Sequence, residues 1–119
     1  MDDFSDMSNE LIESQLNISP FSVNRAWQGR RFRTPEFKQW QKAVLLMMPK
    51  MKMIKGEVAV FMKFYLKSIK RSDCDNFIKC ILDCCVAKGW IEDDRYIMEI
   101  NAKKIKRNTE GFEIQIVKL

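Results

Sequence analysis

The sequence predicts a single α+β domain in which a mixed β-sheet carries two helices on one face, in the order βαβαββ. A chain of 119 residues is long enough for one hydrophobic core but too short for two. Two segments show the apolar period of amphipathic helices, and four others show the pattern of strands. Packing both helices on one face is the economical way for so short a chain to cover its sheet.

The first half of the chain contains a strand, a loop, a helix and a second strand. Residues 11–19 alternate weakly and predict the first strand, and Pro20 to Arg33 follows as a long loop. Thr34-Pro35 is typical of a helix start, an N-cap followed by proline at the first helical position, and Pro49 ends this helix. Residues 57–67 give the clearest strand. Its side chains on the apolar face are Val58, Val60, Met62, Phe64 and Leu66.

The second helix has a narrow polar stripe on an otherwise apolar surface. We expect it to run from Asp75 to Lys88, with Ser72 or Asp73 as N-cap and Gly89 as the residue that ends it. A small sheet covers only part of so much apolar surface, so we expect a homodimer formed through part of this helix. The polar stripe consists of Asp75, Lys79 and Asp83.

Two strands complete the predicted fold. Residues 97–106 and 112–118 both have strand character. The segment Asn108-Thr109-Glu110-Gly111 between them predicts a hairpin that joins them directly.

The charges are unevenly distributed along the chain. The net charge is +5, yet the first fourteen residues hold five of the 16 acidic residues and no lysine or arginine. From Gln15 onward there are 21 basic and 11 acidic residues. We therefore divide the chain into an acidic N-terminal extension, residues 1–14, and a basic domain, residues 15–119, whose surface suits a polyanionic partner.

Composition excludes several classes of function. No stretch reaches the roughly 18 apolar residues of a membrane span, and an acidic N-terminus is unlike a signal peptide, so we expect a cytoplasmic protein. Without any histidine there is no histidine general base, and no glycine-rich phosphate loop indicates an organic cofactor. The four cysteines, Cys74, Cys80, Cys84 and Cys85, indicate neither a zinc site nor disulfides. We expect Cys80, Cys84 and Cys85 to be buried.

Four aspartates surround the second helix. Asp73 and Asp75 precede it, Asp93 and Asp94 follow its return loop, and the loop is long enough to bring Asp94 back to the other two. Clustered carboxylates repel one another unless a cation lies between them, and oxygen-only ligands favour Mg²⁺ or Mn²⁺. Taken alone, an aspartate at a helix start is usually a cap, an Asp-Asp pair after a glycine is usually a solvated loop, and a single helical lysine such as Lys79 usually lies on the surface.

Basic and aromatic residues alternate in the loop before the first helix. Arginines can bind phosphates, whereas Trp27 and Phe32 can either stack on exposed bases or anchor the loop to the core; both interpretations stay open. The predicted nucleic-acid-binding residues are Asn24, Arg25, Arg30, Arg31, Arg33, Lys70, Arg71 and Asn76.

The spacing of the acidic residues resembles the signature of the RusA family of Holliday junction resolvases, small dimeric endonucleases of bacteria and prophages. The similar segments read DCDNFIK, then Asp83, then GWIEDD ending at Asp94, together with PFSVNRAW and RTPEF upstream. The resemblance covers roughly residues 15–119, and no motif position is substituted. The acidic segment before the first strand is longer than such chains usually carry.

The resemblance implies a RusA-like fold and an enzyme that resolves four-way branched DNA by paired cleavage in recombination and repair. It also implies that Asp73, Asp75 and Asp94 bind Mg²⁺ and that Lys79 is the catalytic lysine. Whether Lys79 serves its own subunit or its partner is open, as are the number of metal ions and the cleavage-site preference.

Two other functions stay open on sequence alone. The chain could be a non-catalytic module for branched or single-stranded DNA, with the carboxylates acting as caps. It could also be a metal nuclease that acts on flaps or single strands, which would share the site and differ in substrate shape.

Overall fold

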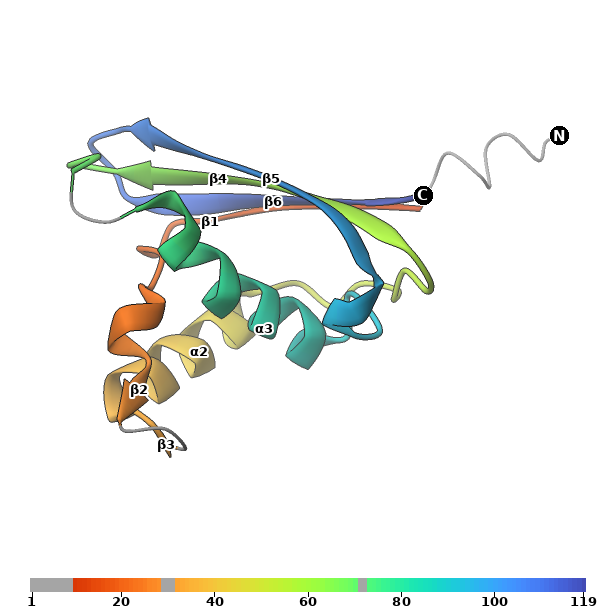
Figure 1. The fold of residues 1–119 in the computed structure, drawn as a ribbon, viewed down its shortest axis with the longest axis horizontal. Helices are drawn as coiled ribbons and strands as arrows, with labels where there is room; N and C mark the ends of the chain where they lie inside the picture. Colours follow the sequence, from red (N-terminus) through yellow and green to blue (C-terminus); the bar gives the residue numbers. More distant parts are fainter. Residues whose placement is uncertain (1–9, 29–31, 71–72) are drawn as a thin grey trace, which may run out of the picture.

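The computed structural model describes residues 10–28, 32–70 and 73–119, and it contains a mixed four-stranded sheet in the order β1-β6-β4-β5. Two α-helices lie on the same face of the sheet (Figure 1). The predicted α+β class is thereby confirmed. The strands are β1 (Leu11–Leu16), β4 (Val58–Leu66), β5 (Ile97–Lys106) and β6 (Gly111–Lys118), and the helices are α2 (Pro35–Met47) and α3 (Ile78–Lys88).

Shorter elements flank the helices. Where the sequence predicted a loop, β2 (Trp27–Gln28) and β3 (Phe32–Arg33) form a small antiparallel pair. The 3-10 helices are η1 (Val23–Arg25), η2 (Cys74–Phe77) and η3 (Asp94–Tyr96). Within the described ranges, no helix has the length and apolar character needed to cross a membrane.

The predicted hairpin between the last two strands is wrong. Strand β4 lies between them and pairs parallel with β5 and antiparallel with β6. Its inward side chains are buried along its whole length, so a central position with neighbours on both edges suits it better than an edge. The β5–β6 connection passes the end of β4, where the Arg107 N–H donates to the Leu66 carbonyl at 2.8 Å and the Lys67 N–H donates to Glu110 at 2.9 Å.

Strand β1 begins at Leu11, where it pairs with Val117, and ends at Leu16 instead of continuing to Ser19. Leu16 pairs with Phe112 and the partner strand β6 begins at Gly111, so the ladder stops there, and the Ser19 carbonyl accepts a hydrogen bond from the Trp40 indole at 2.7 Å instead. Residues 11–14, where the predicted first strand overlaps the predicted acidic extension, belong to β1, and residues 1–9 lie outside the described part of the chain.

The helix termini follow the local sequence signals. Helix α2 begins after Thr34, whose hydroxyl accepts a hydrogen bond from the Phe37 N–H at 3.2 Å, and it ends before Pro49. Helix α3 is preceded by η2, so the predicted helix starts with a 3-10 turn. It ends at Gly89, whose φ of 80° is the left-handed conformation that glycine adopts readily.

The core lies between the sheet and the two helices. Phe37 and Trp40 of α2 form an aromatic cluster with Phe21 and Phe112, with ring centroids 5.7 to 6.2 Å apart. Five apolar side chains of α3 are buried within the single chain, as predicted for its cysteines, whereas Ile78 and Val86 are half-buried, so only a small part of this helix is left for the predicted dimer contact. The buried side chains are Cys80, Ile81, Leu82, Cys84 and Cys85.

Candidate active site

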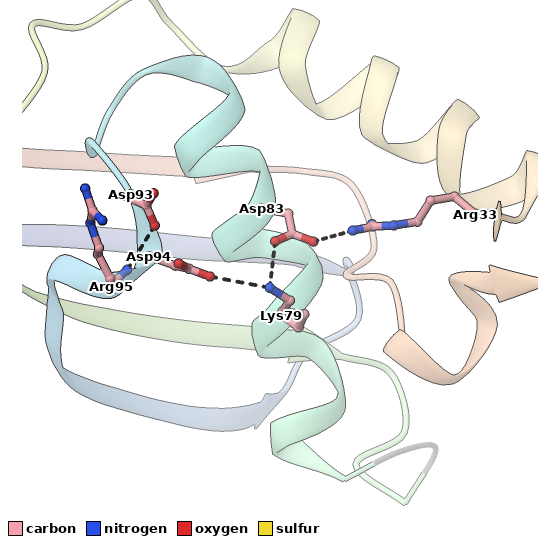
Figure 2. Close-up of polar contacts among 6 residues, drawn as sticks. All are labelled: Arg33, Lys79, Asp83, Asp93, Asp94 and Arg95. Atoms are coloured by element: carbon pink, nitrogen blue, oxygen red, sulfur yellow. Dashed lines mark hydrogen bonds and ion pairs between the residues drawn. The ribbon is translucent and has the colours of Figure 1, made fainter. Parts of the chain in front are cut away.

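Lys79 lies between two carboxylates from different elements (Figure 2). It stands in the first turn of α3, and its Nζ is 3.2 Å from Oδ1 of Asp83, one turn further along the same helix. On the other side, Nζ is 3.6 Å from Oδ2 of Asp94, which η3 holds beside α3. The return loop that the sequence only showed to be long enough does bring Asp94 back to this helix.

Asp83 extends this arrangement to Arg33, which precedes α2. Its Oδ2 accepts a hydrogen bond from Arg33 Nη2 at 2.9 Å, so one carboxylate contacts both basic side chains. Sequence reasoning placed Asp83 on the polar stripe without giving it a role. Its spacing of four residues from Lys79 was the available signal for an ion pair.

The ion pairs favour the charged form of Lys79. The hydrogen bond with Asp83 is the largest cause that raises the pKa of the lysine above its ordinary value, and Asp94 adds to it. The ammonium therefore stays charged at neutral pH, although half of the side chain is exposed to solvent. A fixed positive charge that is still accessible can interact with a phosphate.

The neighbouring aspartates Asp93 and Asp94 have different positions. Asp93 caps η3, because its Oδ1 accepts a hydrogen bond from the Arg95 N–H at 3.2 Å (Figure 2). This hydrogen bond is the main reason why the pKa of the Asp93 carboxyl is lowered. Asp94 instead faces Lys79, so the second aspartate of the pair is the one that contacts α3.

Asp73 and Asp75 lie at the N-terminal end of α3, the end that also carries Lys79. Asp73 precedes η2 with an extended backbone, and its side chain makes no capping hydrogen bond; Asp75 is the second residue of η2. Both side chains are exposed. The carbonyl of Asp73 accepts a hydrogen bond from the Asn76 N–H at 3.1 Å, which fixes the backbone of this turn.

In the part of the chain that the structure describes, no three acidic or cysteine side chains lie close enough together to form a metal site. The predicted ligands Asp73, Asp75 and Asp94 are thus placed around one end of α3 without converging, and their shared metal stays a prediction. The donor set nevertheless fits Mg²⁺ or Mn²⁺, because it offers only carboxylate oxygens and the Asp73 side chain is not used as a cap.

Several predicted nucleic-acid-binding residues lie near this site. Asn24 and Arg25 are exposed on η1 and, together with Phe77 of η2, line an open pocket of about 500 Å³. The Arg25 guanidinium lies 5.0 Å from the ring centroid of Phe21. Lys70 is exposed and Asn76 is half-buried. The predictions for Arg30, Arg31 and Arg71, and for the side chains of Trp27 and Phe32, fall outside the described part of the chain.

Two comparisons with known proteins bear on this arrangement. The model of the family described as "Endodeoxyribonuclease RusA" matches residues 19–117, which include every element from η1 to β5 and all of the site. A relative from Aquifex aeolicus (strain VF5), named crossover junction endodeoxyribonuclease RusA, is 28% identical over 120 residues, covering 92% of this chain and 95% of that relative. The family resemblance seen in the sequence is confirmed, and the chain belongs to the RusA family of endodeoxyribonucleases.

Proposed function

We propose that this endodeoxyribonuclease resolves Holliday junctions, cutting two opposed strands of four-way DNA in recombination and repair. The observation that carries the proposal is the family match over nearly the whole chain, together with a relative that is named for crossover junctions. The site supports it, because the charged Lys79 lies 3.6 Å from Asp94 and stands at the same end of α3 as the exposed Asp73 and Asp75. We expect the enzyme to act in the cytoplasm of a bacterial or phage-infected cell, where such DNA is found.

The proposed chemistry needs an activated water and stabilisation of negative charge on the scissile phosphate. Asp73, Asp75 and Asp94 would hold Mg²⁺, or Mn²⁺ in its place, which when bound supplies both a nucleophilic water and charge neutralisation. The Lys79 ammonium would add a fixed charge at the phosphate or the leaving oxygen. Arg25 and Asn24, which line the same pocket as Phe77 of η2, would hold the DNA strand by its phosphates.

We further propose that the enzyme is a homodimer and that the outer edge of β5 forms its interface. Among the described strands, none pairs with that edge. Apolar side chains are exposed along it, with Met98 at 59% and Ile100 at 46%. A two-fold dimer would present two equivalent sites to a junction that is itself nearly two-fold symmetric.

Sedimentation at micromolar concentration tests the dimer. We expect the wild type to sediment as a dimer and Ile100→Lys as a monomer, because a charge at this edge opposes strand pairing. A wild-type monomer, or an Ile100→Lys dimer, would contradict the assigned interface.

Cleavage of a synthetic mobile four-way junction, a matched duplex and a flap tests the activity. The comparison uses wild type and Asp75→Asn, each with Mg²⁺ and with EDTA. We expect paired nicks near the crossover that need the metal and disappear in Asp75→Asn while junction binding persists. If the flap is cut as fast as the junction, the enzyme is not specific for junctions and the proposed substrate is wrong. Junction binding without any cut would reject the proposed activity.

A further inference from the structure

Asp83 connects two basic side chains that are far apart in the sequence (Figure 2). One carboxylate oxygen is 2.9 Å from Arg33 Nη2 and the other is 3.2 Å from Lys79 Nζ. The Asp83 side chain is 19% exposed, compared with 53% for Lys79. Because both of its oxygens have charged partners and little water reaches it, this carboxylate is held in one orientation.

Arg33 is itself well fixed, so it can serve as the anchor of this arrangement. It ends β3 and directly precedes Thr34, whose N–H donates to the Ala26 carbonyl at 2.8 Å. Its guanidinium lies over the Phe37 ring, 4.4 Å from the centroid. The Asp83 carboxylate is therefore attached to the start of α2 as well as to its own helix.

Lys79 depends on this carboxylate when Asp94 has another partner. In the structure the ammonium is shared between Asp83 and Asp94, with the shorter contact to Asp83. A cation held by Asp94 would repel the ammonium and weaken that second contact. A lysine side chain has four rotatable bonds, so without Asp83 the ammonium would spread over many positions.

We infer that Asp83 is a positioning residue: fixed by Arg33, it holds the Lys79 ammonium beside the site while Asp94 binds the metal. This inference rests on the proposed function. The competing explanation is an ion pair that stabilises the packing of α2 against α3 and has no effect on Lys79 during cleavage.

A double-mutant cycle separates the two explanations. Single-turnover cleavage of the junction is measured for wild type, Asp83→Asn, Lys79→Ala and the double variant. We expect Asp83→Asn to slow cleavage roughly 10- to 100-fold, as loss of an orienting partner does at other sites. In the Lys79→Ala background the same change should slow cleavage less than about 2-fold, since it acts through the lysine. Equal slowing in both backgrounds would overturn the inference.

Two further variants keep the test specific. Glu10→Gln is the matched control, because it removes a carboxylate that lies 3.2 Å from a lysine, Lys118, at the opposite end of the chain. It should cleave like wild type. Asp83→Glu keeps the charge and the helical spacing and should recover part of the rate lost in Asp83→Asn. No recovery, or equal slowing in Glu10→Gln, would contradict a role in positioning.

A measurement without DNA or metal distinguishes failure of this inference from failure of the proposed function. In protein labelled with ¹⁵N at the lysine Nζ, Asp83→Asn should broaden or shift the Lys79 ammonium signal, whereas Glu10→Gln should leave it unchanged. An unchanged Lys79 signal in Asp83→Asn overturns the inference that Asp83 positions Lys79. A changed Lys79 signal in a protein that cuts no DNA supports the contact between Asp83 and Lys79 and rejects the resolvase activity.

Discussion

Replacement of Thr34 by alanine removes two hydrogen bonds that one hydroxyl makes at the start of α2. Its Oγ1 accepts from the Phe37 N–H at 3.2 Å and donates to the Arg25 carbonyl at 2.7 Å. An N-cap hydroxyl contributes about 1 kcal/mol, and the second hydrogen bond about 1 kcal/mol more. We therefore expect Thr34→Ala to lower the free energy of unfolding by about 2 kcal/mol, or Tm by about 8 °C for a domain of this size.

Urea denaturation followed by tryptophan fluorescence measures this loss. Thr34→Ser is the matched control, because serine keeps the hydroxyl and both hydrogen bonds.

The Thr34→Ala change also removes the hydrogen bond to the Arg25 carbonyl, so the backbone of Arg25 is held less firmly and junction binding at low salt should weaken. The slope of log K against log salt should stay the same, since no charge is removed.

Two results would refute this reasoning. If Thr34→Ser destabilises the protein as much as Thr34→Ala, the hydroxyl is not the source of the effect. If Thr34→Ala lowers the free energy of unfolding by less than about 0.5 kcal/mol, the two hydrogen bonds do not contribute as the cap geometry requires.

Three further predictions concern the charge of Lys79, the cysteine thiols and two of the glycines. Lys79→Met should slow junction cleavage by about 10²- to 10³-fold in single-turnover assays while binding persists. Burial raises the pKa of the Cys85 thiol above 9.0, so the unfolded chain loses that proton first. Stability in urea titrations should therefore fall as the pH rises above about 9, and a thiol reagent should label half-buried Cys74 before Cys85. Gly111→Ala should cost about 2 kcal/mol or more in urea, because its Cβ would lie 2.5 Å from a β1 carbonyl oxygen. At Gly89, where the nearest atom is 3.9 Å away, alanine should cost only about 1 kcal/mol for its positive φ.

Local signals predicted the elements well. Thr34-Pro35 and Gly89 mark helix ends because capping depends on residues within one turn of each other. The alternation in residues 57–67 predicted β4, since a strand buried on one face needs an apolar side chain at every second position. Of the predicted stripe, the structure shows the pair of Lys79 and Asp83, one helical turn apart, whereas Asp75 lies in the preceding 3-10 helix η2.

Pairing between distant segments could not be read from such signals. Arg33 and Asp83 are 50 residues apart, and Arg33 was predicted only to bind DNA. The last two strands looked like a hairpin because they are adjacent in the chain, yet β4 separates them. Which strands pair depends on how the apolar side chains of all strands are buried together, which is a property of the whole sheet.

The interior position of β6 has a consequence for the order in which the protein folds. Strand β6 follows the other three strands in the chain but lies between β1 and β4, so among the described strands β1 has no partner until β6 is in place, when Leu11 pairs with Val117. The unit from β4 through α3 to β5 carries Lys79 and Asp94 and relies on contacts of shorter range, so we expect it to form first. The contact between Lys79 and Asp94 would then exist before the N-terminal strand is fixed, and Asn24 and Arg25, which follow β1, would take their places last.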